Sequence, residues 1–246
     1  MRKSDEYRGT KGVSVVAAYV AIASAIAAFG LLVSLHLLSP EFSPAWRLVS
    51  EYANGHYPLV LSLMFGAYGL ATLALVWAIK SDVATRGGTV GLAFLIASGI
   101  GQASASVFSI NLPTLHYLAG AFGVLCLPIG AVLVSRSLGS LERWSAAKRP
   151  LVLSAHLTWI AVVLFAASFP LMMVTFVAAQ GALPSSPPAQ LPHGVVAVVG
   201  WFDRLILLSA WGWVSMAAGW VIAIQRTERA RGSRIANSMA LKSTAP

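Results

Sequence analysis

Charged side chains and histidines in this sequence gather in short segments between long apolar runs. Carboxylate, imidazole and guanidinium groups brought together can bind a polar head group, hold a metal ion or switch charge near neutral pH. The candidate cluster consists of Glu51, His116, Arg204, Asp203, His36, His56 and Arg47. We expect this cluster either to bind a ligand or to fasten the fold. The spacing assigns no residue a catalytic role.

A metal or haem site is the most specific chemistry that these residues could support. Zinc takes three or four His, Cys or carboxylate ligands. The chemically adequate residues are His36, His56, His116 and Glu51. A haem held by His36 and His116 is a second, weaker alternative. No HxxxH, HExxH or CxxC spacing places two ligands on one helix, and the single cysteine lies inside an apolar run. The sequence therefore predicts no metal and no cofactor.

The segment SPEFSPAWRLVSEYANGHYP, after the first apolar run, has the signals of a short surface helix. Ser43-Pro44 reads as a helix cap followed by proline at the first helical position. Arg47 and Glu51 would then lie four residues apart and pair on one face. Alternatively, Glu51 points at the bundle and meets a cation there. A contact between Arg204 and Glu51 would close this loop onto the last helix.

Six long runs without Asp, Glu, Lys or Arg predict the elements that position the cluster. A bilayer core about 30 Å thick needs roughly 20 apolar residues of helix. The runs lie at about 13–38, 57–79, 88–110, 114–135, 151–178 and 205–225. We expect an all-α integral membrane bundle of six transmembrane helices over 13–225. A basic N-terminus at 1–12 precedes it, and a basic, disordered tail at 226–246 follows it.

Composition excludes a soluble enzyme and a disulfide-linked secreted scaffold. Hydrophobic residues make up 57% of the chain and charged residues 10%, against about 25% charged in an average soluble domain. The motif search agrees, because the sequence has no phosphate loop, no GxSxG and no dinucleotide-binding fingerprint.

The net charge of +9 reflects topology rather than nucleic-acid binding. With the N-terminus inside, fifteen of the 17 Lys and Arg residues fall in cytoplasmic segments, and only Arg47 and Arg204 fall outside. This asymmetry predicts that both termini are cytoplasmic. It places the candidate cluster on the outer face of a multi-pass membrane protein, with no nucleic-acid partner. The Ala-rich composition, with more Arg than Lys, favours the inner membrane of a prokaryote.

A stripe of polar side chains marks the third run as a central helix. Ser98, Gln102 and Ser106 recur every four residues, beside small residues that allow close helix contact. Unsatisfied polar groups in hydrocarbon are costly, so the stripe should face protein. Leu95 falls on another part of the same helix.

Several short motifs carry a resemblance to a known family. The first run ends in His36 with Ser39-Pro40, Thr114-Leu115-His116 opens the fourth run, and Gly200-Trp201-Phe202-Asp203-Arg204 enters the last. Together they resemble the prokaryotic multi-pass membrane family catalogued as domain of unknown function 998, over about residues 13–226. The resemblance implies six helices and no established activity.

Three functions are compatible with this sequence. The favoured one is a binding or accessory role, in which the outward polar site takes a lipid, a small solute or a partner membrane protein. The alternatives are an integral membrane enzyme acting at the outer leaflet and a small transporter. An outward pocket would favour the first two, and a polar route across the bilayer would favour the third.

Overall fold

The computed structural model describes residues 2–184, 188 and 190–243, and every regular element in that part of the chain is helical. The six long helices are α1 (Arg2–Leu38), α2 (Pro58–Ile79), α3 (Arg86–Ala105), α4 (Pro113–Leu138), α5 (Ser145–Gln180) and α6 (Val199–Ser243). Two short 3₁₀ helices, η1 (Val49–Asn54) and η2 (Glu142–Trp144), lie in the connections.

All six long helices contain a stretch long and apolar enough to cross a membrane. The predicted all-α fold with six spans is therefore confirmed, and the protein is a multi-pass membrane protein in contact with the lipid bilayer. At about 1.5 Å per residue, the 36 residues of α5 extend roughly 54 Å, well beyond a bilayer core of about 30 Å.

The two terminal segments are more helical than expected. α1 begins at Arg2, and α6 continues through the tail at 226–246 as far as Ser243. The tail was expected to be disordered, but it is rich in Ala and Arg and has no proline before Pro246, so nothing in its sequence stops the helix. Met1 and residues 244–246 of these two predicted segments lie outside the described residues.

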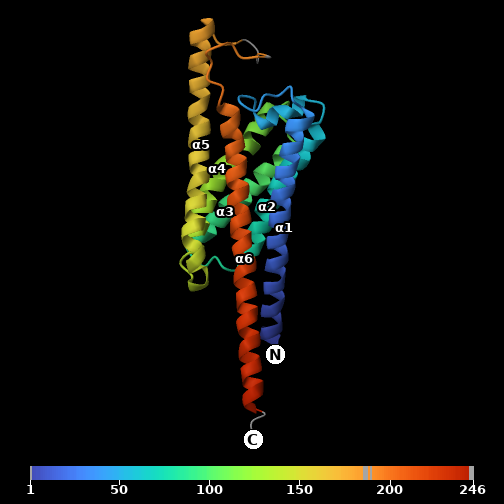
Figure 1. The fold of residues 1–246 in the computed structure, drawn as a ribbon, viewed down its shortest axis with the longest axis vertical. Coiled ribbons are helices and arrows are strands. Elements are labelled where there is room, and N and C mark those ends of the chain that lie inside the picture. Colours follow the sequence, from blue (N-terminus) through green and yellow to red (C-terminus); the bar gives the residue numbers. More distant parts are fainter. Residues whose placement is uncertain (1, 185–187, 189, 244–246) are drawn as a thin grey trace.

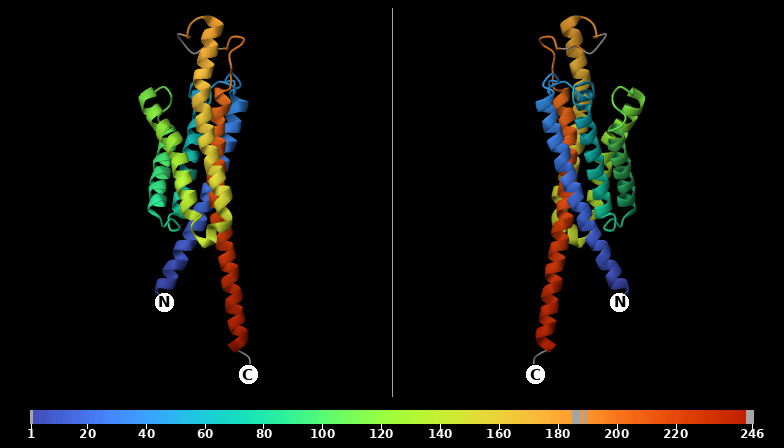
Figure 2. Two further views of the ribbon diagram at one scale, coloured as in Figure 1. Left: turned by 90° about the vertical axis from the view of Figure 1, so that its left-hand side faces the viewer. Right: turned by 90° about the vertical axis from the view of Figure 1, so that its right-hand side faces the viewer.

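Both chain termini lie at one end of the bundle (Figure 1). We call this the terminal end, and call the opposite end, which carries the α1–α2, α3–α4 and α5–α6 connections, the loop end. α6 contacts α1, α2 and α5, while α3 packs between α2 and α4. Toward the loop end, the α3–α4 hairpin leans away from α5 and α6 (Figure 2).

Glycines allow α2, α3 and α4 to approach backbone to backbone. A Cβ atom on Gly101 of α3 would lie 2.6 Å from the carbonyl oxygen of Ala119 on α4. A Cβ atom on Gly69 of α2 would lie 2.7 Å from the amide nitrogen of Ala103. Such close contact through small residues is how membrane helices gain packing energy without a hydrophobic driving force.

A buried polar node lies where these three helices meet. The Gln102 amide donates to Ser98 Oγ at 2.8 Å, and Ser98 Oγ donates to the Gly123 carbonyl at 2.7 Å. Thr72 of α2 donates to Gln102 Oε1 at 2.8 Å. The third residue of the stripe, Ser106, bonds to Ala103 on its own helix. The stripe thus connects α3 to α2 and α4 through two of its three members.

Candidate functional site

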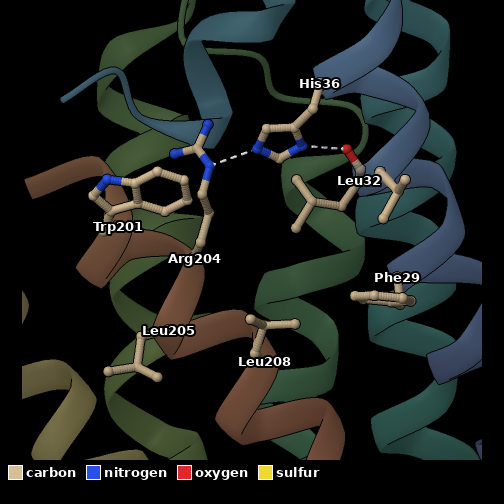
Figure 3. A pocket seen from close by; sticks show the side chains of 8 residues that line it. Phe29, Leu32, His36, Trp201, Arg204, Leu205 and Leu208 are labelled. Carbon is tan, nitrogen blue, oxygen red and sulfur yellow. Dashed lines mark hydrogen bonds between the residues drawn. The ribbon is translucent and has the colours of Figure 1, made fainter. Parts of the chain in front are cut away.

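Arg204, in the second turn of α6, is the centre of a hydrogen-bonded clamp at the loop end. Its side chain is buried, and Nε donates to His36 Nε2 on α1 at 2.7 Å (Figure 3). Nη1 donates to the carbonyl oxygens of Arg47 and Gly200, at 2.8 and 2.9 Å. Nη2 donates to the Tyr52 hydroxyl at 3.3 Å. The guanidinium therefore ties together α1, α6 and the α1–α2 connection, residues 39–57, which we call the first loop.

The hydrogen bonds of His36 fix its tautomer. Its Nδ1 lies 2.6 Å from the carbonyl oxygen of Leu32 in the same helix. A carbonyl oxygen only accepts, so Nδ1 carries the proton and Nε2 accepts from Arg204. His36 is thus a neutral imidazole with both ring nitrogens engaged. Among the described residues, every hydrogen-bond partner of Arg204 is uncharged.

Asp203 holds the same loop from the other side of α6. Its Oδ2 accepts from the backbone N–H of Val49 at 2.7 Å. Gly200 makes the approach possible, since its N–H donates to Ala45 at 2.9 Å and a Cβ there would lie 2.7 Å from the Arg47 carbonyl oxygen. Two adjacent charged residues of α6 thus anchor one loop at two backbone positions.

Glu51 pairs with Arg47 rather than with Arg204. The Arg47 Nη1 to Glu51 Oε2 distance is 3.2 Å, and Arg47 Nη2 also donates to the Pro188 carbonyl at 2.9 Å. Burial raises the pKa of Glu51 above its usual range, and the positive charge of Arg47 opposes this shift. Asp203 and Arg204 lie close enough for their charges to act on Glu51 as well.

The helix in this loop is shorter than the sequence suggests. Only a single turn follows Ser43, closed by the Arg47 N–H to Ser43 carbonyl bond of 3.0 Å, and the 3₁₀ helix begins at Val49. The Arg47 carbonyl accepts a hydrogen bond from Arg204, and the Val49 N–H donates one to Asp203. These backbone groups are therefore not available for the hydrogen bonds of a continuous helix.

The remaining two histidines of the predicted cluster lie apart from the clamp. His56 is largely exposed, with Nδ1 3.8 Å from Glu41 Oε1. His116 is buried in the first turn of α4, where Nδ1 lies 2.8 Å from the Phe108 carbonyl oxygen. In the described part of the chain, no hydrogen bond joins His116 to Glu51 or Arg204. Among the described residues there is also no group of three or more His, Cys, Asp or Glu side chains placed to hold a metal ion.

His116 and Asp203 instead border a cavity of about 500 Å³ between α4, α5 and α6. Its polar lining residues are Ser50, His116, Tyr117 and Asp203, and the rest of the wall is apolar, with Phe65, Val162 and Phe169 among its members. On α4, the lining residues Tyr117 and Leu125 are 65% and 47% exposed at the surface. The cavity therefore opens sideways between α4 and α5, where a bilayer would surround the helices.

A smaller pocket of about 220 Å³ lies on the opposite side of α6, against α1. Its wall is formed by apolar side chains such as Phe29, Leu205 and Leu208, with His36 and Arg204 at its upper end (Figure 3). The two charged residues near the start of α6 thus border different hollows, Asp203 the large cavity and Arg204 the small pocket.

Sequence reasoning found His116 and Asp203 but not the cavity or Ser50. The apolar residues that line the cavity have the same types as residues that face lipid or fill a core. The space lies between α4, α5 and α6, and the way these helices pack against one another cannot be read from hydrophobic spacing. The sequence also did not predict the open space at Gly120, where an added Cβ would meet no atom within 4 Å.

Comparison with known proteins gives a family and no described function. Searches of curated proteins and of solved structures found no match. A family model described as Protein of unknown function (DUF998) matches residues 21–220, which include both sides of the clamp and the whole cavity wall. The chain belongs to this family.

Proposed function

We propose that this protein binds a membrane lipid, or a similar amphiphile, in the cavity between α4, α5 and α6. The cavity itself is the observation that carries the proposal. Its volume of about 500 Å³ falls within the roughly 300–1,000 Å³ of typical ligand pockets. An apolar chain fits the wall, and a polar head group would meet Ser50, His116 and Asp203. The sideways opening would let a lipid enter directly from the bilayer.

The proposal includes an orientation. We place the loop end outside and both termini in the cytoplasm of a prokaryotic cell, with the protein in the inner membrane. The support is the distribution of positive charge, fifteen Lys and Arg residues toward the terminal end and two toward the loop end. The ligand would then be a lipid of the outer leaflet. Binding of this kind requires no cofactor.

Filling the cavity tests the proposal. Gly120 lines it, and a Cβ at this position meets no atom within 4 Å, so Gly120→Phe should place a ring in the hollow without displacing a neighbour. Gly30, an exposed glycine of α1 with equally open surroundings, provides the control Gly30→Phe. The readout is binding of a fluorescent oleyl-chain probe to purified protein in detergent.

We expect Gly120→Phe to weaken probe binding at least about tenfold, while Gly30→Phe binds as the wild type does. Thermal unfolding of both variants checks that the fold is intact. Equal binding by all three proteins would show that the probe attaches elsewhere, and would overturn the proposal. Absence of any binding to the wild type would do the same.

A further inference from the structure

We infer that the ligand of this cavity carries a hydrogen-bond-donating head group without negative charge, a hydroxyl or an ammonium, on its apolar chain. This inference rests on the proposed lipid binding and specifies its chemistry. It follows from the polar groups that border the cavity, taken one at a time.

His116 presents an acceptor. Its Nδ1 lies 2.8 Å from the Phe108 carbonyl oxygen, which can only accept, so in the neutral ring the proton resides on Nδ1. Nε2 then carries a lone pair and accepts. No residue in the described part of the chain donates a hydrogen bond to this nitrogen. A ligand that donates to Nε2 would satisfy it in an environment with little water.

Asp203 presents a second acceptor. One carboxylate oxygen, Oδ2, takes the N–H of Val49 at 2.7 Å. Among the described residues, Oδ1 receives no hydrogen bond. A carboxylate offers lone pairs and no donor, so this residue also selects a donating group. Ser50 and Tyr117, the other polar residues of the lining, have hydroxyls that can serve in either direction.

No positive charge of the clamp borders the cavity to attract an anion. Arg204 lies on the other side of α6 and donates to His36, the first loop and its own helix. Arg47 pairs with Glu51 and does not line the cavity. An anionic head group beside the ionised form of Asp203 would meet like charge, and exclusion of water strengthens that repulsion.

A panel of ligands with one chain and four head groups tests the inference. Oleyl alcohol and oleylamine donate hydrogen bonds, oleyl methyl ether only accepts them, and oleyl sulfate is permanently anionic. Each competes for the wild-type protein with the fluorescent oleyl probe at neutral pH. We expect the alcohol or the amine to displace the probe at least about tenfold more effectively than the ether and the sulfate. The relative strength of the two donors separates a hydroxyl ligand from an ammonium ligand.

Asp203→Asn provides the matched variant, because the amide oxygen can still accept from Val49 while the negative charge is lost. In this variant oleylamine should lose affinity relative to oleyl alcohol, and oleyl sulfate should gain. Glu41→Gln, a loop carboxylate that does not line the cavity, should leave the order unchanged. If Asp203→Asn does not fold, the wild-type panel decides alone.

The outcomes separate the inference from the function on which it rests. Binding of all four ligands with similar affinity, or a preference for the ether or the sulfate, would overturn the inference and leave lipid binding standing. Failure of every oleyl compound to bind would overturn lipid binding itself.

Discussion

At the level of single residues, Arg204 shows what a sequence reveals and what it hides. An arginine and an aspartate at the start of an apolar helix are costly, so their types and position predicted that both have partners. One alternative paired Arg204 with Glu51, whereas the other paired Glu51 with Arg47, as the structure has it. The structure gives it backbone oxygens, a hydroxyl and a neutral imidazole instead. Backbone acceptors exist at every residue, and only the folded path of the loop selects among them.

Removing the guanidinium should loosen the first loop. Arg204→Met leaves His36 Nε2, the Arg47 carbonyl and the Tyr52 hydroxyl without their donor. Because unpaired buried polar groups are costly, we expect a stability loss of about 2–4 kcal/mol. The measurement is thermal unfolding in detergent, combined with the rate of proteolysis in the first loop.

Arg47→Gln is the control for this variant, because Arg204 uses the backbone carbonyl of Arg47 and not its side chain. It leaves two acceptors, the Glu51 carboxylate and the Pro188 carbonyl, without the Arg47 donor, whereas Arg204→Met leaves four acceptors without theirs. We therefore expect a smaller stability loss than in Arg204→Met. Equal losses in the two variants would mean that the loop depends on the Arg47–Glu51 pair rather than on Arg204.

The raised pKa of Glu51 predicts a pH dependence. Because burial favours the protonated form in the folded protein, the stabilising contribution of this residue is fully present below its unfolded pKa of about 4.5. It is lost as the pH rises through the folded value. The side chain introduced by Glu51→Gln is neutral at every pH. The melting temperature of this variant, relative to that of the wild type, should therefore rise between pH 4 and 7. A difference that shrinks over this range would show that pairing with Arg47 outweighs burial.

At the level of elements, the spacing along α3 predicted a buried polar stripe but misplaced Leu95. Gln102 and Ser98 are buried as a polar stripe between helices would be. Leu95 was expected on another part of the helix, but it is fully buried and lies against Gly130 of α4. Seven residues, almost two full turns, separate Leu95 from Gln102, so both side chains lie on the same face of α3. Polar and apolar contacts to α4 thus share one face of this helix.

Gln102→Leu should lower stability, since it leaves Thr72 without its acceptor and removes the donor to Ser98. Hydrogen bonds between membrane helices contribute about 0.6 kcal/mol on average and at most about 2 kcal/mol. We therefore expect a measurable decrease in melting temperature without loss of the fold. Ile100, 55% exposed on the same helix, supplies the control Ile100→Leu, which should change little. A higher melting temperature for Gln102→Leu would contradict the role of the node.

At the level of the whole molecule, composition and the length of the apolar runs were sufficient to predict six membrane-spanning helices, because the bilayer sets a minimum length for each. The same constraint says nothing of the angles between helices. Toward the loop end the α3–α4 hairpin leans away from α5 and α6 (Figure 2), and the cavity borders α4, α5 and α6. α6 extends far along its tail, which has no proline before Pro246. These features depend on contacts between distant segments and on propensity outside the bilayer, which hydropathy does not report.

The orientation of the molecule is the last prediction, and it rests on charges that the fold now places. The loop-end cations Arg47 and Arg204 are both engaged in hydrogen bonds with the first loop or its partners. The many remaining basic residues lie toward the terminal end, where Lys80 sits 3.0 Å above the ring of Trp77. Such a bias directs the basic end to the cytoplasm.

Cysteines introduced into a Cys126→Ala background can test this orientation in intact cells. His193 is exposed at the loop end and Ser145 is exposed at the terminal end. An impermeant thiol reagent added outside should label His193→Cys and not Ser145→Cys, and both should react once the membrane is permeabilised. Labelling of Ser145→Cys alone before permeabilisation would show that the orientation is the reverse. The cavity would then take its ligand from the cytoplasmic leaflet.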